Sequence, residues 1–115
     1  MYNNTMDLQE KRLEKDDINT SIKNILGWSR NKGFLHSGNL HSQMIKLFEE
    51  LGEFSAEVIK CEREKMIREY GDILTVLVNI GEMIDTSFEE ALLLSYTKIK
   101  DRAGRVENGT FIKDK

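Results

Sequence analysis

Two short acidic motifs hold the side chains of this sequence that are best suited to chemistry. Glu49, Glu50 and Glu53 form an E-E-x-x-E motif, and Glu69 with Asp72 forms E-x-x-D. On a helix, residues three apart lie about 60° apart around the axis, so each pair projects from one face. Carboxylates that meet at one place repel one another and need a cation, and an all-oxygen ligand set favours Mg²⁺ or Mn²⁺. The two motifs are therefore candidates for a divalent-metal site.

The alternative is that these acids are solvated or paired with Lys and Arg, which is the usual state of acids on a Glu-rich helix. In helical projection Glu69 is in line with Ile73, Val76 and Ile80, on the apolar side of its segment. Few basic residues share that side, and an unpaired charge is costly there. This placement favours a metal site.

The spacing of apolar residues predicts four helices around these motifs. The first begins after Asp17, whose side chain can cap it, and ends near Gly33, with Trp28 closing it. The second runs from about residue 39 past residue 59, and the third covers roughly 66–84. The fourth opens with a Ser87–Glu90 capping box and continues to about residue 102. Asn108-Gly109 then predicts a small terminal hairpin.

The acids can meet only if the chain turns back between them. Glu50 and Glu69 are 19 residues apart, which is about 28 Å along one continuous helix. They can share an ion only if the chain folds back near residues 60–65, or if a second subunit supplies one pair. We predict the fold-back.

Composition limits the class of protein. A chain of 115 residues has room for one domain, and its net charge of −3 does not favour nucleic acid as a partner. The sequence has no proline, and its single cysteine excludes an internal disulfide framework. There is neither a membrane-length apolar stretch nor a signal-peptide pattern. We therefore expect a cytoplasmic, all-α protein that does not bind membranes, with a polar N-terminal arm at 1–17.

At two places the sequence resembles the MazG-like, all-α nucleoside triphosphate pyrophosphohydrolases. The first is K-L-F-E-E-L-G-E at 46–53 and the second is E-Y-G-D-I-L at 69–74, and the resemblance extends from about residue 28 to the tail. It implies a MazG-like helical domain at 18–103, a turn or tail at 104–115, and hydrolysis of a nucleoside or deoxynucleoside triphosphate to the monophosphate and pyrophosphate. It also implies that Mg²⁺, or Mn²⁺ in its place, is held by Glu50, Glu53, Glu69 and Asp72.

Other residues are candidates for contact with this substrate. Glu49, beside the metal-binding acids, would orient or deprotonate the attacking water. Alternatively, it would only support the metal ligands without contacting the metal. Lys46 would bind phosphate or pair with Glu50, and Lys98 and Arg102, expected four apart on the last helix, would bind phosphate or form a solvated basic end. Asn79 would contact the sugar or phosphate, or would belong to the core. Trp28 and Phe34 would stack on the base, or would belong to the core, and Gln43 would contact the substrate.

The predicted architecture is a four- to five-helix bundle with a central antiparallel hairpin that carries the acidic site. The core is thin for the length of the chain, so a homodimer or homotetramer is expected, in agreement with the resemblance. A ferritin-like oxidase is excluded because neither histidine lies three residues after a glutamate. The competing hypothesis is a non-catalytic helical interaction module in which the acids are structural.

Overall fold

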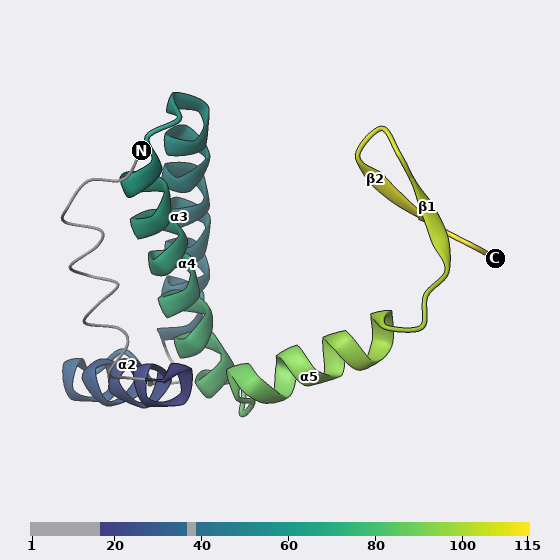
Figure 1. Ribbon diagram of the computed structural model, residues 1–115. Coiled ribbons are helices and arrows are strands. Elements are labelled where there is room, and N and C mark those ends of the chain that lie inside the picture. The colour runs from purple at the N-terminus through teal and green to yellow at the C-terminus, as the bar shows by residue number, and fades with distance from the viewer. Residues whose placement is uncertain (1–16, 37–38) are drawn as a thin grey trace. The chain divides into compact units, whose positions relative to one another are not determined.

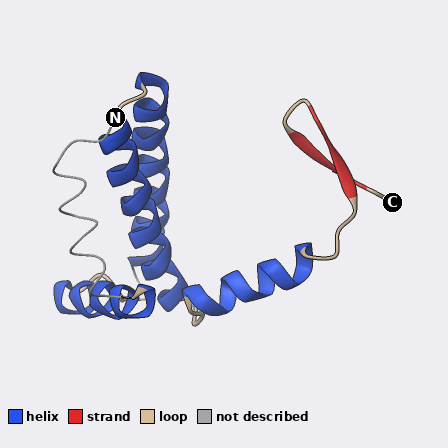
Figure 2. Ribbon diagram, viewed as in Figure 1, coloured by secondary structure: helices blue, strands red, loops and turns tan. Residues whose placement is uncertain are grey.

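The computed structural model describes residues 17–36 and 39–115, so most of the predicted arm at 1–17 lies outside the described residues. The described residues form four helices and a two-stranded hairpin, which makes the protein mostly helical (Figures 1 and 2). The chain divides into two compact units after Asp85, which falls inside the expected 18–103 domain. The first unit contains α2 (Ile18–Lys32), α3 (Leu40–Lys60) and α4 (Arg63–Met83), and the second contains α5 (Phe88–Ile99), β1 (Gly104–Glu107) and β2 (Thr110–Lys113).

Helix α2 begins and ends where its local signals predict. Asp17 Oδ1 accepts a hydrogen bond of 2.7 Å from the backbone N–H of Thr20, and Gly33 ends the helix at φ +82°. The helix continues one turn past Trp28, so the prediction that Trp28 closes it was wrong.

The fold-back near residues 60–65 is confirmed. Cys61 ends α3 in the left-handed region at φ 59°, and Glu62 is extended before α4 begins at Arg63, three residues earlier than predicted. The two 21-residue helices then lie side by side and antiparallel (Figure 1). This hairpin places the E-E-x-x-E and E-x-x-D segments opposite each other.

The apolar core lies mainly on α4. The large apolar side chains that are buried, among the residues described, all belong to this helix: Ile73, Val76, Val78 and Ile80. Polar residues are buried beside them, namely Ser29 on α2, Glu50 on α3 and Asn79 on α4. The small core thus contains polar side chains of types that are usually exposed in proteins.

The second unit carries the predicted cap and turn. The backbone N–H of Glu90 donates to Ser87 Oγ at 3.0 Å, but the Glu90 carboxylate accepts from the Thr86 hydroxyl, so the capping box is only half formed. Asn108 and Gly109 both have positive φ, 51° and 78°, and connect antiparallel strands in which Gly104 pairs with Lys113. The predicted hairpin is therefore confirmed.

The predicted extent of the last helix was wrong. Helix α5 ends at Ile99 and Arg102 follows after a turn at residues 100–101, so Lys98 and Arg102 do not share one helical face as predicted. Among the described helices, none is both long and apolar enough to cross a bilayer.

Candidate functional site

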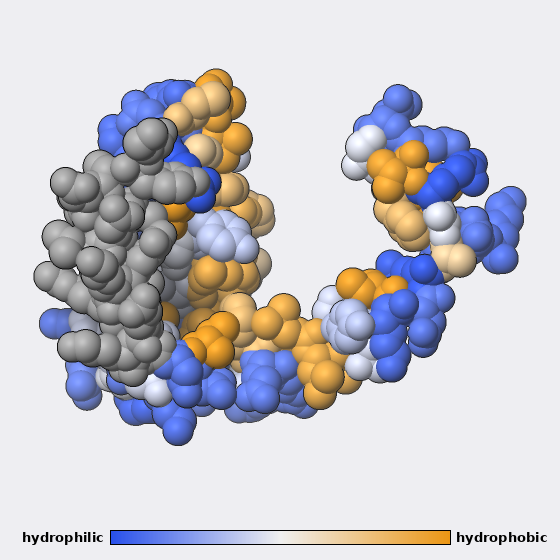
Figure 3. All heavy atoms as spheres, in the orientation of Figure 1, coloured by the Kyte–Doolittle hydropathy of each residue, from blue (hydrophilic) through white to orange (hydrophobic). Residues whose placement is uncertain are grey.

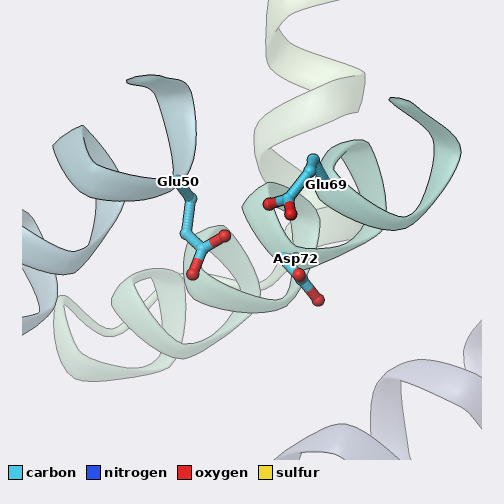
Figure 4. Close-up of side chains that lie close together, drawn as sticks. All are labelled: Glu50, Glu69 and Asp72. Carbon is cyan, nitrogen blue, oxygen red and sulfur yellow. The ribbon is translucent and has the colours of Figure 1, made fainter. Parts of the chain in front are cut away.

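Three carboxylates converge across the α3–α4 hairpin. One oxygen each from Glu50, Glu69 and Asp72 can be chosen so that all three lie within 4.8 Å of one another. Figure 4 shows Glu50 reaching from α3 toward Glu69 and Asp72 on α4. Because the helices are antiparallel, the turn that carries Glu50 lies opposite the turn that carries the E-x-x-D motif.

The acidic cluster lacks enough hydrogen-bond donors for its carboxylate oxygens. Glu50 is 5% exposed, and its Oε1 lies 3.0 Å from Lys46 Nζ. Its Oε2 is buried and has no hydrogen-bond partner among the described residues, and the same holds for Glu69 Oε2. A buried carboxylate oxygen without a partner is costly, so this cluster needs a proton or a cation.

The titration of the cluster reflects this shortage of positive charge. Burial raises the pKa of Glu69 to about 7, together with the neighbouring carboxylates of Glu50 and Glu53. Burial and the charge of Glu50 also raise the pKa of Asp72, while Lys46 opposes that shift. The ion pair with Glu50 raises the pKa of Lys46 itself, so this side chain is firmly cationic. Near neutral pH the cluster thus takes up a proton unless another cation replaces it.

Two predicted acids stand outside this group of three. Glu53 is exposed, yet its charge contributes to the raised pKa of Glu69, so it borders the cluster. Glu49 is also exposed, and its charge acts on Lys46. The structure therefore brings together three of the four predicted metal ligands and leaves the fourth at their edge.

A pocket of about 560 Å³ opens beside the acids. Ten residues of the first unit line it: Trp28, Phe34, Ser42, Gln43, Lys46, Glu50, Asp72, Thr75, Val76 and Asn79. Asn79 lies seven residues beyond Asp72 on α4, or about 10 Å along the helix, and Gln43 lies a similar distance from Glu50 in the opposite chain direction. The pocket therefore extends from the acids along the hairpin.

Aromatic and amide groups also line the pocket. The rings of Trp28 and Phe34 are 5.5 Å apart and tilted, and Trp28 is 53% exposed, which does not fit the alternative of a core residue. Asn79 is 3% exposed, and its Oδ1 accepts no hydrogen bond from the described residues. The alternative of a satisfied core amide therefore does not hold for this oxygen.

The sequence did not identify every residue that lines the pocket. Ser42, Thr75 and Val76 were not predicted, although Thr75 follows Asp72 by three residues and thus shares its side of α4. Lys98 and Arg102, predicted to bind phosphate, belong to the second unit.

A helical hairpin with converging carboxylates and an adjoining pocket defines an all-α protein with a candidate metal centre. The family model of the MazG nucleotide pyrophosphohydrolase domain matches residues 39–106, more than half of the chain, and the chain belongs to this family. The matched segment includes α3, α4, α5 and all but the last residue of β1, whereas α2 with Trp28 precedes it. Comparisons with curated proteins and with solved structures gave no significant match.

Proposed function

We propose that this protein hydrolyses a nucleoside or deoxynucleoside triphosphate between the α- and β-phosphates, releasing the monophosphate and pyrophosphate. Membership of the MazG family supports nucleotide pyrophosphohydrolase activity as the general class. The observation that carries the proposal is the convergence of Glu50, Glu69 and Asp72 within 4.8 Å beside a pocket that Trp28 and Phe34 also line. Such a pocket suits a ligand with a charged end and a flat apolar end.

The residues present fit a divalent cation. Glu50, Glu69 and Asp72 would hold it, with Glu53 completing the set from the edge, and the oxygens without partners are the free ligand positions. Mg²⁺ is the ion that we propose, and Mn²⁺ is a substitute with similar ligand preference. When bound, such an ion supplies positive charge for phosphate oxygens and lowers the pKa of coordinated water.

Lys46 has two tasks in this proposal. Its ammonium group lies 3.0 Å from Glu50 and also lines the pocket, so it fixes the Glu50 carboxylate and remains available to a phosphate. Because the ion pair with Glu50 keeps Lys46 protonated, the positive charge of Lys46 offsets the repulsion between the acids and a polyphosphate. The two alternatives from the sequence, phosphate ligand and salt-bridge partner, are thus compatible.

The remaining candidates position the substrate and water. Trp28 and Phe34 would stack on the base, and Asn79 and Gln43 would hydrogen-bond to the sugar or the base edge. Glu49 would orient or deprotonate water from beside the cluster. Lys98 and Arg102 remain proposed phosphate ligands from the second unit. Positioning and charge stabilisation suffice for phosphoryl transfer, so no nucleophilic side chain is required.

The role that we propose is removal of surplus or damaged nucleotides in the cytoplasm, without nucleic acid or membrane as partners. The test is pyrophosphate release from a panel of NTPs and dNTPs with Mg²⁺, using the full chain. Glu50→Gln and Asp72→Asn are expected to abolish turnover, whereas Glu62→Gln, an exposed acid paired with Lys65, serves as the matched control. If no nucleotide is cleaved and Mg²⁺ leaves thermal stability unchanged, the protein is instead a helical interaction module.

A further inference from the structure

Asn79 differs from the other polar side chains that line the pocket. Four of the lining residues carry a hydroxyl or a side-chain amide, namely Ser42, Gln43, Thr75 and Asn79. Asn79 is 3% exposed, whereas the other three are half-buried or exposed. Apolar side chains are plentiful, and Figure 3 shows them at the surface along one side of the hairpin. Nevertheless, an amide occupies this buried position between Val78 and Ile80 on α4.

The oxygen of the Asn79 amide has no hydrogen-bond donor. Within the described residues, five buried side-chain oxygens lack a partner, and Asn79 Oδ1 and Glu50 Oε2 are the two that belong to pocket-lining residues. The Glu50 carboxylate can be neutralised by a proton or a cation, but an amide is already neutral and needs a donor. Because a buried polar atom without a partner is destabilising, the Asn79 amide serves a ligand better than it serves the fold.

We infer that Asn79 determines which nucleotides this protein accepts, because its Oδ1 accepts a hydrogen bond from a donor on the nucleoside part of the substrate. The inference rests on the proposed function and adds to it one residue that sets selectivity. Two groups of a nucleotide can supply the donor, a hydroxyl of the sugar and an N–H of the base. The terminal torsion of an asparagine side chain is soft, so the amide can turn its oxygen toward either group.

The nucleoside, rather than the phosphates, fits the position of Asn79. Phosphate oxygens of an ionised triphosphate are acceptors only, so they cannot satisfy the Asn79 oxygen. Lys46 is the only basic residue among the described residues that line the pocket, and it is paired with Glu50. Asn79 lies about 10 Å along α4 from Asp72. The phosphates are therefore expected at the acids and Lys46, and the nucleoside at Asn79.

Burial decides how strongly a missing donor on the ligand is felt. Beside the half-buried Gln43, water can replace a hydrogen bond that a ligand fails to make. At Asn79, a ligand without the donor would fill the pocket and leave the amide oxygen buried and unpaired. Sites that hydrogen-bond a substrate through buried polar groups reject analogues that lack the partner group strongly. We therefore expect selectivity to depend on Asn79 and not on Gln43.

The experiment measures dissociation constants by isothermal titration calorimetry, using the full chain with Mg²⁺. The probes are α,β-methylene nucleoside triphosphates, which resist cleavage at the proposed bond. Analogues of the most tightly bound nucleotide each lack one donor: the 2′-hydroxyl, the 3′-hydroxyl or the base N–H. The wild type should bind one of these analogues roughly 10- to 100-fold more weakly than the parent nucleotide. The analogue that is weakened identifies the group that Asn79 recognises.

Asn79→Leu removes the acceptor and nearly keeps the volume of the side chain. It should bind the parent nucleotide roughly 10- to 100-fold more weakly, and parent and analogue within about threefold of each other. Its unfolding temperature without ligand should equal or exceed that of the wild type, because a buried unpaired oxygen is removed. Gln43→Leu should keep the wild-type ratio between parent and analogue. Asn24→Leu, which changes an exposed amide of α2 outside the pocket, should leave both affinities unchanged.

Three results would overturn the inference. The first is a wild type that binds the parent and every analogue equally, which requires no variant to fold. The second is an Asn79→Leu protein, or Asn79→Ala if the former does not fold, that keeps the wild-type ratio. The third is a lowered unfolding temperature with unchanged affinities, which would make the amide structural.

Failure of the proposed function gives a different result. Nucleotides that bind with this selectivity, while the corresponding NTPs and dNTPs stay intact, would refute hydrolysis and support the role of Asn79. If no nucleotide binds, both the proposed function and the inference are refuted.

Discussion

The α3–α4 hairpin and the unit formed by residues 86–115 differ in what their packing achieves. The hairpin buries apolar side chains of α4 together with the carboxylate of Glu50, whereas no residue of the second unit is buried. Yet local signals are as clear in the second unit, where Ser87 caps α5 and Asn108-Gly109 forms the turn. Local signals thus suffice to form helices and turns, but carboxylates with a raised pKa require the long-range packing found in the hairpin.

The largest expected effect tests whether activity depends on the hairpin. Glu50→Gln removes the buried carboxylate around which the other acids gather, and turnover should fall on the order of 10³-fold. Glu90→Gln changes an exposed acid of α5 in the same way and should leave turnover within about twofold. Steady-state pyrophosphate release measures both. Equal losses in the two variants would remove the distinction between the regions.

The second effect concerns the two exposed aromatics Trp28 and Tyr96, one beside the pocket and one on α5. Trp28→Ala should raise KM roughly 10- to 100-fold, because stacking on a base is worth about 1–3 kcal/mol. Tyr96→Ala should leave KM unchanged, since Tyr96 does not line the pocket. Initial rates over a range of nucleotide concentrations distinguish them. A rise in KM for Tyr96→Ala alone would contradict the assignment of the pocket.

The third effect is the dependence of Mg²⁺ affinity on pH. Because the pKa of Glu69 is raised to about 7, the ion must displace a proton at low pH, and affinity should rise roughly tenfold between pH 6 and pH 8. Isothermal titration calorimetry in buffers of different ionisation enthalpy would also count the released proton. A flat profile over this range would mean that Glu69 is not a ligand.

The same shift makes a prediction for the metal-free protein. The pKa of Glu69 lies above its ordinary value in the folded state, so the folded state binds more protons than the unfolded state. Its contribution to stability is therefore complete below about pH 4.5 and is lost as pH rises through about 7. Asp72 acts in the same direction. In EDTA, the unfolding temperature should fall over this window, and Mg²⁺ should restore it at pH 8.

The smallest effect is confined to the second unit. Ser87→Ala removes the side chain that caps α5 and should destabilise that helix by about 1 kcal/mol. Amide hydrogen exchange along α5 would detect the change, while the affinity for Mg²⁺ should stay the same. Altered Mg²⁺ affinity would show that the cap also supports the acidic cluster, and the two regions would then be coupled.

Much of the fold follows from residues that act locally. Asp17, Gly33 and Ser87 mark helix ends through their own hydrogen bonds or φ angles. The fold-back had no such signal, because Cys61 takes a left-handed conformation more typical of glycine. It was predicted only from the need for Glu50 and Glu69 to meet. The end of α5 lacked a signal too, and for that reason the predicted placement of Lys98 and Arg102 four residues apart on one helix was wrong.

The candidate site was predictable in its chemistry and not in its full membership. The motif spacing indicated Glu50, Glu69 and Asp72, whose oxygens the hairpin brings together. Glu53 has the same i, i+3 spacing from Glu50 as Asp72 has from Glu69, yet Glu53 is exposed and lies outside the group of three, a difference that spacing does not encode. Ser42 and Thr75 line the pocket because of how the helices pack together, which apolar periodicity does not encode.

The most direct test of the central claim is a crystal structure grown with Mn²⁺, with anomalous diffraction data collected to locate the ion. The account predicts an anomalous peak between the α3 and α4 carboxylates, with oxygens of Glu50, Glu69 and Asp72 in its coordination sphere. A crystal that contains Mn²⁺ elsewhere, while these three side chains bind none, would contradict it.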